Sequence, residues 1–154
     1  MKILQMERVN LGKQAPELYK TVLELENLSN LRIKSAGIEV GFSHLLKLRA
    51  SQINQCAFCV RLHTQDAIKA GESIDRITLI SAWEESDYFS EKERACLSLI
   101  EEITLIAQHH FSDDQYKKIA QTLSDEEITA IEWLSIVINT WNRIAISSRY
   151  QVKP

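Results

Sequence analysis

Two thiols and an imidazole stand at helical spacing within residues 56–63, which read CAFCVRLH. Offsets of three and seven residues from Cys56 lie within about 60° of one another around a helix axis, so one helix face can carry all three groups. Cys59 and His63 are four residues apart, close enough for a thiol–imidazole hydrogen bond. Cys56 falls in the first turn of the expected helix, where free N–H groups and the helix dipole favour a thiolate.

Three kinds of chemistry fit these residues. Both thiols can be core packing, with His63 an ordinary buried polar residue. Cys56, Cys59 and His63 can be three zinc ligands, but no fourth ligand stands nearby, and Cys96 lies on an apolar helix face far along the chain. A close dithiol can instead form a reducible disulfide and supply an activated nucleophile. We favour this redox interpretation, which requires no metal, haem or flavin.

The motif needs a helix to hold it, and periodicity predicts one over residues 55–70, with Asn54 as its N-cap and Gly71 as its left-handed end. No alternation of strands and helices surrounds it, so a thioredoxin fold is not expected. Apolar spacing predicts further helices from Pro16 to before Gly37, over 39–53 and over 74–83, and a polar loop over 84–88.

In the second half of the chain, pairs of residues match the capping box that starts a helix. The pairs are Ser90 with Glu93, Ser112 with Gln115, and Ser124 with Glu127. They predict helices over 91–108, 113–121 and 125–148. The last helix is apolar on most faces, so it should be buried on more than one side. We therefore predict an all-α fold, a helical bundle of about six or seven helices.

Composition agrees with one ordinary globular domain over residues 1–154. The chain has 154 residues, of which 45% are hydrophobic and 25% charged, with only four Gly and two Pro. The net charge of −3 predicts no attraction to nucleic acid or to an anionic membrane. No stretch approaches the roughly 18 apolar residues of a membrane span, and the first ten residues lack a signal-peptide core. Three cysteines are too few for a secreted disulfide framework, so we expect a cytoplasmic protein.

Several segments resemble the AhpD-like alkylhydroperoxidase family, a branch of the carboxymuconolactone decarboxylase superfamily. They are SQINQCAFC at 51–59, HTQDA at 63–67 with Gly71-Glu72, WEES at 83–86 with FSE at 89–91, and INTWNR at 138–143. The resemblance spans roughly residues 15–147. It implies an all-α fold that assembles into dimers, trimers or hexamers. It also implies reduction of organic hydroperoxides or hydrogen peroxide, with an external thiol or a disulfide reductase as electron donor.

Carried over by position, the resemblance implies that Cys59 attacks the peroxide, that Cys56 resolves the product, and that His63 belongs to a proton relay. The family commonly has a glutamate twelve residues before the first cysteine, and here that position is His44. A histidine can also accept and return a proton, so we keep His44 as a candidate relay residue.

Two other functions stay open at this point. A lactone decarboxylase, as in the sister branch of the superfamily, would give no reason for the two cysteines. A non-enzymatic oligomeric module that senses redox state or holds zinc would use them without turnover.

Overall fold

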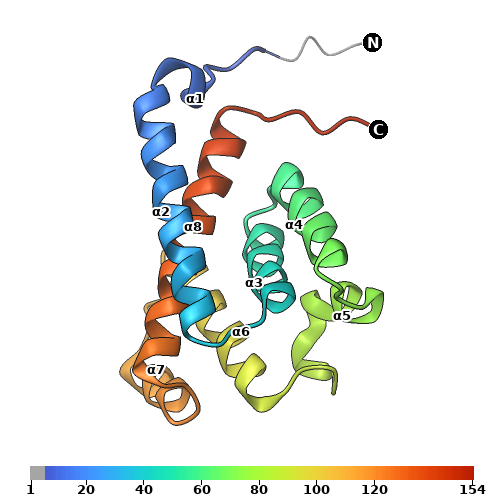
Figure 1. Ribbon diagram of the computed structural model, residues 1–154, viewed down its shortest axis with the longest axis vertical. Helices are drawn as coiled ribbons and strands as arrows, with labels where there is room; N and C mark the ends of the chain where they lie inside the picture. Colours follow the sequence, from blue (N-terminus) through green and yellow to red (C-terminus); the bar gives the residue numbers. More distant parts are fainter. Residues whose placement is uncertain (1–5) are drawn as a thin grey trace.

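The computed structural model describes residues 6–154 and is built from helices throughout those residues, which confirms the all-α prediction (Figure 1). The helices are α1 (Leu11–Gln14), α2 (Pro16–Ser35), α3 (Val40–Ile53), α4 (Ala57–Lys69), α5 (Ile74–Leu79), the 3-10 helix η1 (Ile80–Glu85), α6 (Glu91–Thr104), α7 (Asp113–Ala120) and α8 (Asp125–Ser147). Residues 1–5 lie outside the described residues. They belong to the domain predicted over 1–154 and to the segment in which no signal-peptide core was expected.

Helix α3 is the central element of the fold, because it packs against α4, α6 and α8. Helix α2 runs along α8, and α4 lies beside α3 (Figure 1). The largest completely buried apolar side chains come from α3, α6, α8 and η1: Leu45, Leu46, Leu48, Ile80, Leu97, Leu99, Ile100, Ile131 and Leu134. None of the helices in residues 6–154 has the length and apolar character needed to cross a membrane.

The C-terminal helix α8 contacts α2, α3, α4 and α6, so the prediction that it is buried on more than one side is confirmed. Its start is also as predicted. The Ser124 hydroxyl accepts a hydrogen bond from the Glu127 N–H, and the Glu127 carboxylate accepts one from the Ser124 N–H. Ser90 and Glu93 form the same reciprocal box at α6.

The third predicted capping box is only half formed. Ser112 accepts a hydrogen bond from the Gln115 N–H, as expected, but the Gln115 side chain donates to the Ser98 hydroxyl 2.8 Å away. A partner on another helix has therefore replaced the local one. The start of α7 is still held by the rings of Phe111 and Tyr116, whose centroids are 5.7 Å apart.

Helix boundaries differ from prediction where no packing surface continues the pattern. Helix α6 ends at Thr104 rather than 108, with Leu105 as its C-cap, and Ile106 just beyond it is 53% exposed. The helix expected over 74–83 divides after Leu79 into α5 and η1, and within η1 the backbone kinks at Ala82, which leaves helical geometry. The 3-10 turn also takes in Glu84 and Glu85, which were expected in a loop. The one-turn helix α1 was not predicted.

The link between α3 and α4 corrects the predicted capping of the motif helix. Asn54 is the C-cap of α3, not the N-cap of α4, because its side chain is bonded to residues of α8. Gln55 follows with φ of 55°, a left-handed conformation that costs a non-glycine residue about 1–2 kcal/mol. Cys56 is then the N-cap of α4.

We expect the residue type at position 55 to control stability through this conformation. Gln55→Val should lower the free energy of unfolding by about 1–2 kcal/mol, because a β-branched residue tolerates positive φ least. Gln55→Gly should change it by less than about 1 kcal/mol, since relief of strain is offset by a more flexible unfolded chain. Gln121→Val is the matched control, because exposed Gln121 has an ordinary φ of −72°. Equal destabilisation at the two positions in urea unfolding would contradict the role assigned to φ.

Candidate functional site

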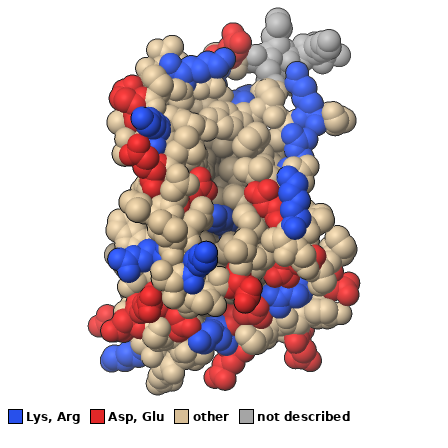
Figure 2. All heavy atoms as spheres, viewed as in Figure 1, with Lys and Arg blue, Asp and Glu red and all other residues tan. Residues whose placement is uncertain are grey.

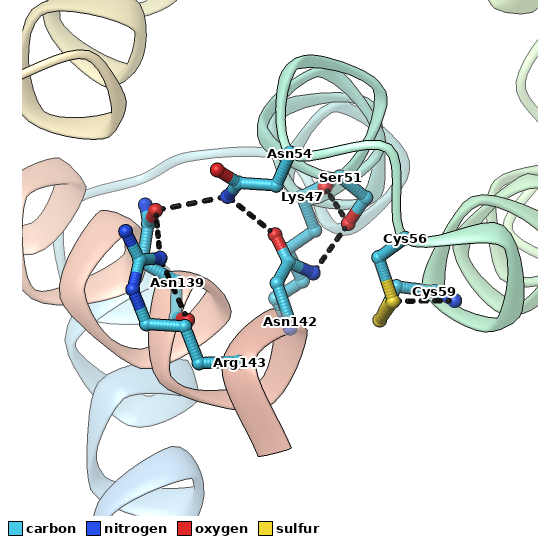
Figure 3. The surroundings of a disulfide bond; sticks show 8 residues. All are labelled: Lys47, Ser51, Asn54, Cys56, Cys59, Asn139, Asn142 and Arg143. Atoms are coloured by element: carbon cyan, nitrogen blue, oxygen red, sulfur yellow. Dashed lines mark hydrogen bonds between the residues drawn. A yellow bond between two sulfur atoms is a disulfide. The ribbon is translucent and has the colours of Figure 1, made fainter. Parts of the chain in front are cut away.

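Cys56 and Cys59 are joined by a disulfide, with their Cα atoms 5.3 Å apart (Figure 3). Cys56 precedes the first turn of α4 rather than lying in it, and its Sγ accepts a hydrogen bond from the Cys59 backbone N–H at 3.3 Å. The extended backbone of Cys56 turns its side chain toward Cys59, so the predicted meeting of the two sulfurs is correct. The N-terminal N–H of α4 that faces Cys56 would also stabilise a thiolate there after reduction.

A buried amide cluster holds the turn that carries Cys56 (Figure 3). The Asn142 side chain donates to the Ser51 hydroxyl at 3.0 Å, and the Asn54 side chain donates to the Asn142 Oδ1 at 2.8 Å and to the Asn139 Oδ1 at 2.9 Å. Asn142 is completely buried, and Arg143 reinforces the cluster by donating to the Asn139 Oδ1 at 2.9 Å. The cluster therefore ties the end of α3, and the cysteine that follows it, to α8.

Cys59 and His63 line a cavity of about 260 Å³ between α2, α4 and α8. Figure 2 shows the molecule hollowed between α2 and α4, with mostly uncharged side chains around the hollow. The remaining lining residues are mainly apolar or aromatic: Tyr19, Leu23, Glu26, Phe58, Leu62, Trp141, Ala145 and Tyr150. Trp141 packs edge-to-face on Tyr19, and both residues line the cavity with Cys59.

Cys56 lines a different cavity, of about 330 Å³, together with Gln55 and two arginines, Arg8 and Arg149. Phe58, Ala145 and Tyr150 line both cavities, and the rings of Phe58 and Tyr150 meet edge-to-face at 5.1 Å. These three residues form a wall between the two cavities. Each cysteine of the disulfide thus lines its own cavity. The cavity of Cys59 is mainly apolar and contains His63, and the cavity of Cys56 is flanked by two arginines.

His63 is 6% exposed, and its Nδ1 is buried without a hydrogen-bond partner. Burial is the main cause that lowers the pKa of His63 to about 3, and the nearby Lys47 ammonium and His44 add to it. His63 is therefore an uncharged base at neutral pH. In this oxidised form Cys59 has no thiol proton, and no hydrogen bond joins it to His63.

The structure brings His44 to His63, although the two are nineteen residues apart in the sequence. Their rings are stacked with centroids 6.1 Å apart, His44 on α3 and His63 on α4. Burial, followed by the Lys47 charge, lowers the pKa of His44, while Asp66 opposes that shift. Like His63, His44 has a buried Nδ1 with no hydrogen-bond partner.

Charged residues around the histidines were missed at the sequence level. Lys47 is 6% exposed, and its Nζ donates to the Asn30 Oδ1 at 3.1 Å and lies 3.9 Å from the Glu26 Oε1. Burial lowers the pKa of Lys47, while Glu26 and Asp66 raise it. The spacing of Lys47 three residues after His44, and of Asp66 three after His63, was the available signal. Glu26 comes from α2 and carries no such signal.

Cys96 lies apart from this site, in the main hydrophobic core on α6. Burial raises the pKa of its thiol to about 12, so it remains a protonated, unreactive side chain. Its expected place on an apolar helix face is confirmed.

Comparisons with known proteins give a family and two similar proteins. The carboxymuconolactone decarboxylase family profile matches residues 16–102. The Bacillus subtilis (strain 168) protein YdfG, itself uncharacterized, is 37% identical over 141 residues, which are 92% of this chain and 93% of YdfG. A crystal structure of an Agrobacterium tumefaciens protein of unknown function, suggested to be the antioxidant defence protein AhpD, is similar with a TM-score of 0.86 and 42% identity. That similarity covers 97% of this chain and 99% of the other.

Buried, uncharged His63 should make stability depend on pH. The unfolded chain takes up a proton as pH falls through 6.5, whereas folded His63 resists protonation down to about 3. The contribution of His63 to the free energy of unfolding is therefore fully present above pH 6.5. It is lost as pH falls, and the loss reaches roughly 1–2 kcal/mol at about pH 5. His63→Gln should flatten this part of the profile in urea titrations, whereas His110→Gln, at an exposed position, should leave it unchanged. An unaltered slope in the His63 variant would contradict the assignment.

Proposed function

This chain belongs to the carboxymuconolactone decarboxylase family, and we propose that it acts as a thiol-dependent peroxidase of the AhpD-like type. The observation that carries the proposal is the Cys56–Cys59 disulfide at the border of two cavities, with His63 beside Cys59 in the apolar one. The suggested antioxidant defence role of the Agrobacterium tumefaciens protein supports the same reading. The disulfide is the product state of the proposed reaction.

Peroxide reduction begins from the dithiol form. The Cys59 thiolate attacks the distal oxygen of the hydroperoxide, the O–O bond breaks, and the alcohol or water leaves with a proton. Cys59 is then a sulfenic acid. The Cys56 thiol attacks that sulfur, the S–S bond forms, and water leaves. One peroxide has been reduced by two electrons, and the two cysteines have been oxidised to the disulfide.

An external thiol of the donor returns the enzyme to the dithiol form. A donor thiolate attacks the Cys56 sulfur from the second cavity, and the bonding electrons leave on Cys59. A second donor thiolate then attacks the donor sulfur of the mixed disulfide and releases Cys56. The cationic side chains of Arg8 and Arg149 beside that cavity would attract an anionic donor.

His63 is placed to handle the protons of these steps. As an uncharged base beside Cys59, it can take the thiol proton and deliver it to the leaving oxygen. The thiolate that forms would raise the pKa of His63, because an opposite charge stabilises the imidazolium. His44, stacked on His63 at 6.1 Å, extends the relay toward α3, at the position where the family commonly has a glutamate.

Apolar side chains dominate the cavity of Cys59, among them Leu23, Leu62 and Trp141. Such a lining suits the organic part of an alkyl hydroperoxide, because its burial removes apolar surface from water. Hydrogen peroxide would also fit the volume of about 260 Å³, but it has no apolar group whose burial against these side chains would favour binding. Lactone decarboxylation would need neither sulfur, so we rank it below peroxide reduction.

We also propose that the protein assembles into a homo-oligomer. Apolar side chains on α2 and α8 are exposed at one groove: Leu28 at 62%, Leu31 at 61% and Trp133 at 45%. A contact with a second copy would remove this surface from water.

Substitution of the two cysteines should affect the reaction with peroxide in different ways. Cys59→Ser should lower hydroperoxide turnover with a dithiol donor at least about 100-fold, since the nucleophile is lost. Cys56→Ser should still react once and leave a sulfenic acid at Cys59, detectable by dimedone labelling and mass spectrometry. Cys96→Ala is the matched control and should keep full turnover. Turnover that survives Cys59→Ser would refute the mechanism, and muconolactone decarboxylation that survives loss of both cysteines would support the alternative function.

The arginines of the second cavity should affect only the donor half-reaction. In the Arg8→Gln/Arg149→Gln variant, reduction of the disulfide by glutathione should slow roughly fivefold at low salt, whereas reduction by 2-mercaptoethanol, whose thiolate carries one negative charge fewer, should slow less. Stopped-flow measurement of each half-reaction separates this effect from peroxide reduction. Arg61→Gln is the control, because Arg61 lines neither cavity. Equal slowing by both thiols would contradict the electrostatic role.

A further inference from the structure

We propose that His44, His63 and Asp66 form a binding site for a divalent transition-metal ion such as Zn²⁺, separate from the cysteine sulfurs. One ligand atom from each residue lies within 4.8 Å of the others. Two imidazoles and one carboxylate are a ligand set that suits Zn²⁺, Co²⁺ and Fe²⁺, and not the oxygen-preferring Ca²⁺ or Mg²⁺. Three protein ligands leave further positions on the ion for water.

The three residues come together through the packing of α3 on α4. His63 and Asp66 are three residues apart on α4, and the His63 Nδ1 lies 3.9 Å from the Asp66 Oδ2. His44 reaches them from α3. Nitrogen and oxygen ligands bind zinc at about 2.0–2.2 Å, so atoms around one ion stand roughly 3–4 Å apart. Shifts of roughly an ångström in these side-chain atoms would bring separations of up to 4.8 Å into that range.

Both histidines are already prepared as ligands. His63 is nine-tenths buried, and the Nδ1 atoms of His63 and His44 are shut off from solvent with no hydrogen-bond partner. A buried polar atom without a hydrogen-bond partner destabilises the folded state, because it has lost its hydration without replacing it. An ion bound to these nitrogens would remove that destabilisation.

The charged side chains around the site determine its affinity for a metal ion. Asp66 contributes a carboxylate directly, and Glu26 adds a second negative charge beside Lys47. The Lys47 ammonium opposes a bound cation, although its own hydrogen bond goes to Asn30 and its ion pair to Glu26. We therefore expect micromolar rather than nanomolar affinity, and we expect removal of the Lys47 charge to tighten binding.

This site differs from the zinc site that the sequence suggested. That site used Cys56, Cys59 and His63, and both of its sulfurs are consumed by the disulfide here. The site of His44, His63 and Asp66 keeps all its ligand atoms in the oxidised protein. An ion there would also occupy the base that takes the Cys59 proton, so zinc would inhibit turnover; only this last consequence rests on the proposed function.

Binding is tested on the full-length oxidised protein without an affinity tag, by calorimetry with Zn²⁺ and by visible absorption with Co²⁺. We expect one ion per chain, affinity reduced at least tenfold in Asp66→Asn and in His44→Gln, and affinity increased in Lys47→Gln. His110→Gln, at an exposed position, should bind as the parent does. Circular dichroism of each variant shows whether the fold is kept, and the Lys47 variant tests the site without removing a ligand.

Three results would overturn the proposal. They are no binding up to millimolar Zn²⁺, unchanged affinity in both ligand variants, and binding that appears only after reduction and disappears in Cys59→Ser. The last result would assign the metal to the thiols. Binding is measured without peroxide, so a protein that binds zinc but lacks peroxidase activity would support this site and refute only the proposed function.

Discussion

The hydrogen bonds of completely buried Asn142 are the constraint on which the site depends. Its side chain links α8 to Ser51 and Asn54 at the end of α3, and the next two residues are Gln55, in a left-handed conformation, and Cys56. An unsatisfied buried amide is costly, so these helices cannot slide past each other without breaking the bonds. The position of Cys56 relative to α8 is fixed in this way, and α8 in turn forms walls of both cavities.

Burial determines the protonation state of the two histidines. His63 is buried and His44 is half-buried near the Lys47 ammonium, and burial and this positive charge both favour the uncharged imidazole. An uncharged imidazole can accept a proton or bind a metal ion, whereas a permanently charged one can do neither. The same surroundings therefore prepare the two histidines for proton transfer and for coordination. Lys47 itself stays in place through Asn30 and Glu26, which belong to α2.

The wall of Phe58, Ala145 and Tyr150 gives the two sulfurs different environments, although they are bonded to each other. A dithiol enzyme must meet an oxidant and a reductant in turn, and separate approaches allow each reactant its own surroundings. The apolar cavity suits an organic group, and the cavity of Arg8 and Arg149 suits an anion.

The sequence by itself determined the helical class, the starts of α6 and α8, and the closeness of Cys56 and Cys59, because each depends on spacing within a few residues. Capping bonds and helical periodicity are local interactions that tertiary packing rarely reverses. The exceptions lay where a distant partner competed: Asn54 bonds to α8 instead of capping α4, and Gln115 bonds to Ser98 instead of completing its box.

Only the tertiary structure decided which distant residues join the site. Glu26 and Trp141 carry no signal that separates them from surface charges or core aromatics, and Lys47 and Asp66 carry only their helical spacing from the histidines, because the roles of all four arise from the crossing of α2, α3, α4 and α8. The sequence also did not predict that His63 is uncharged, because its lowered pKa follows from the exclusion of water around the imidazole ring. Such exclusion is a property of packed helices, which no single segment of sequence contains.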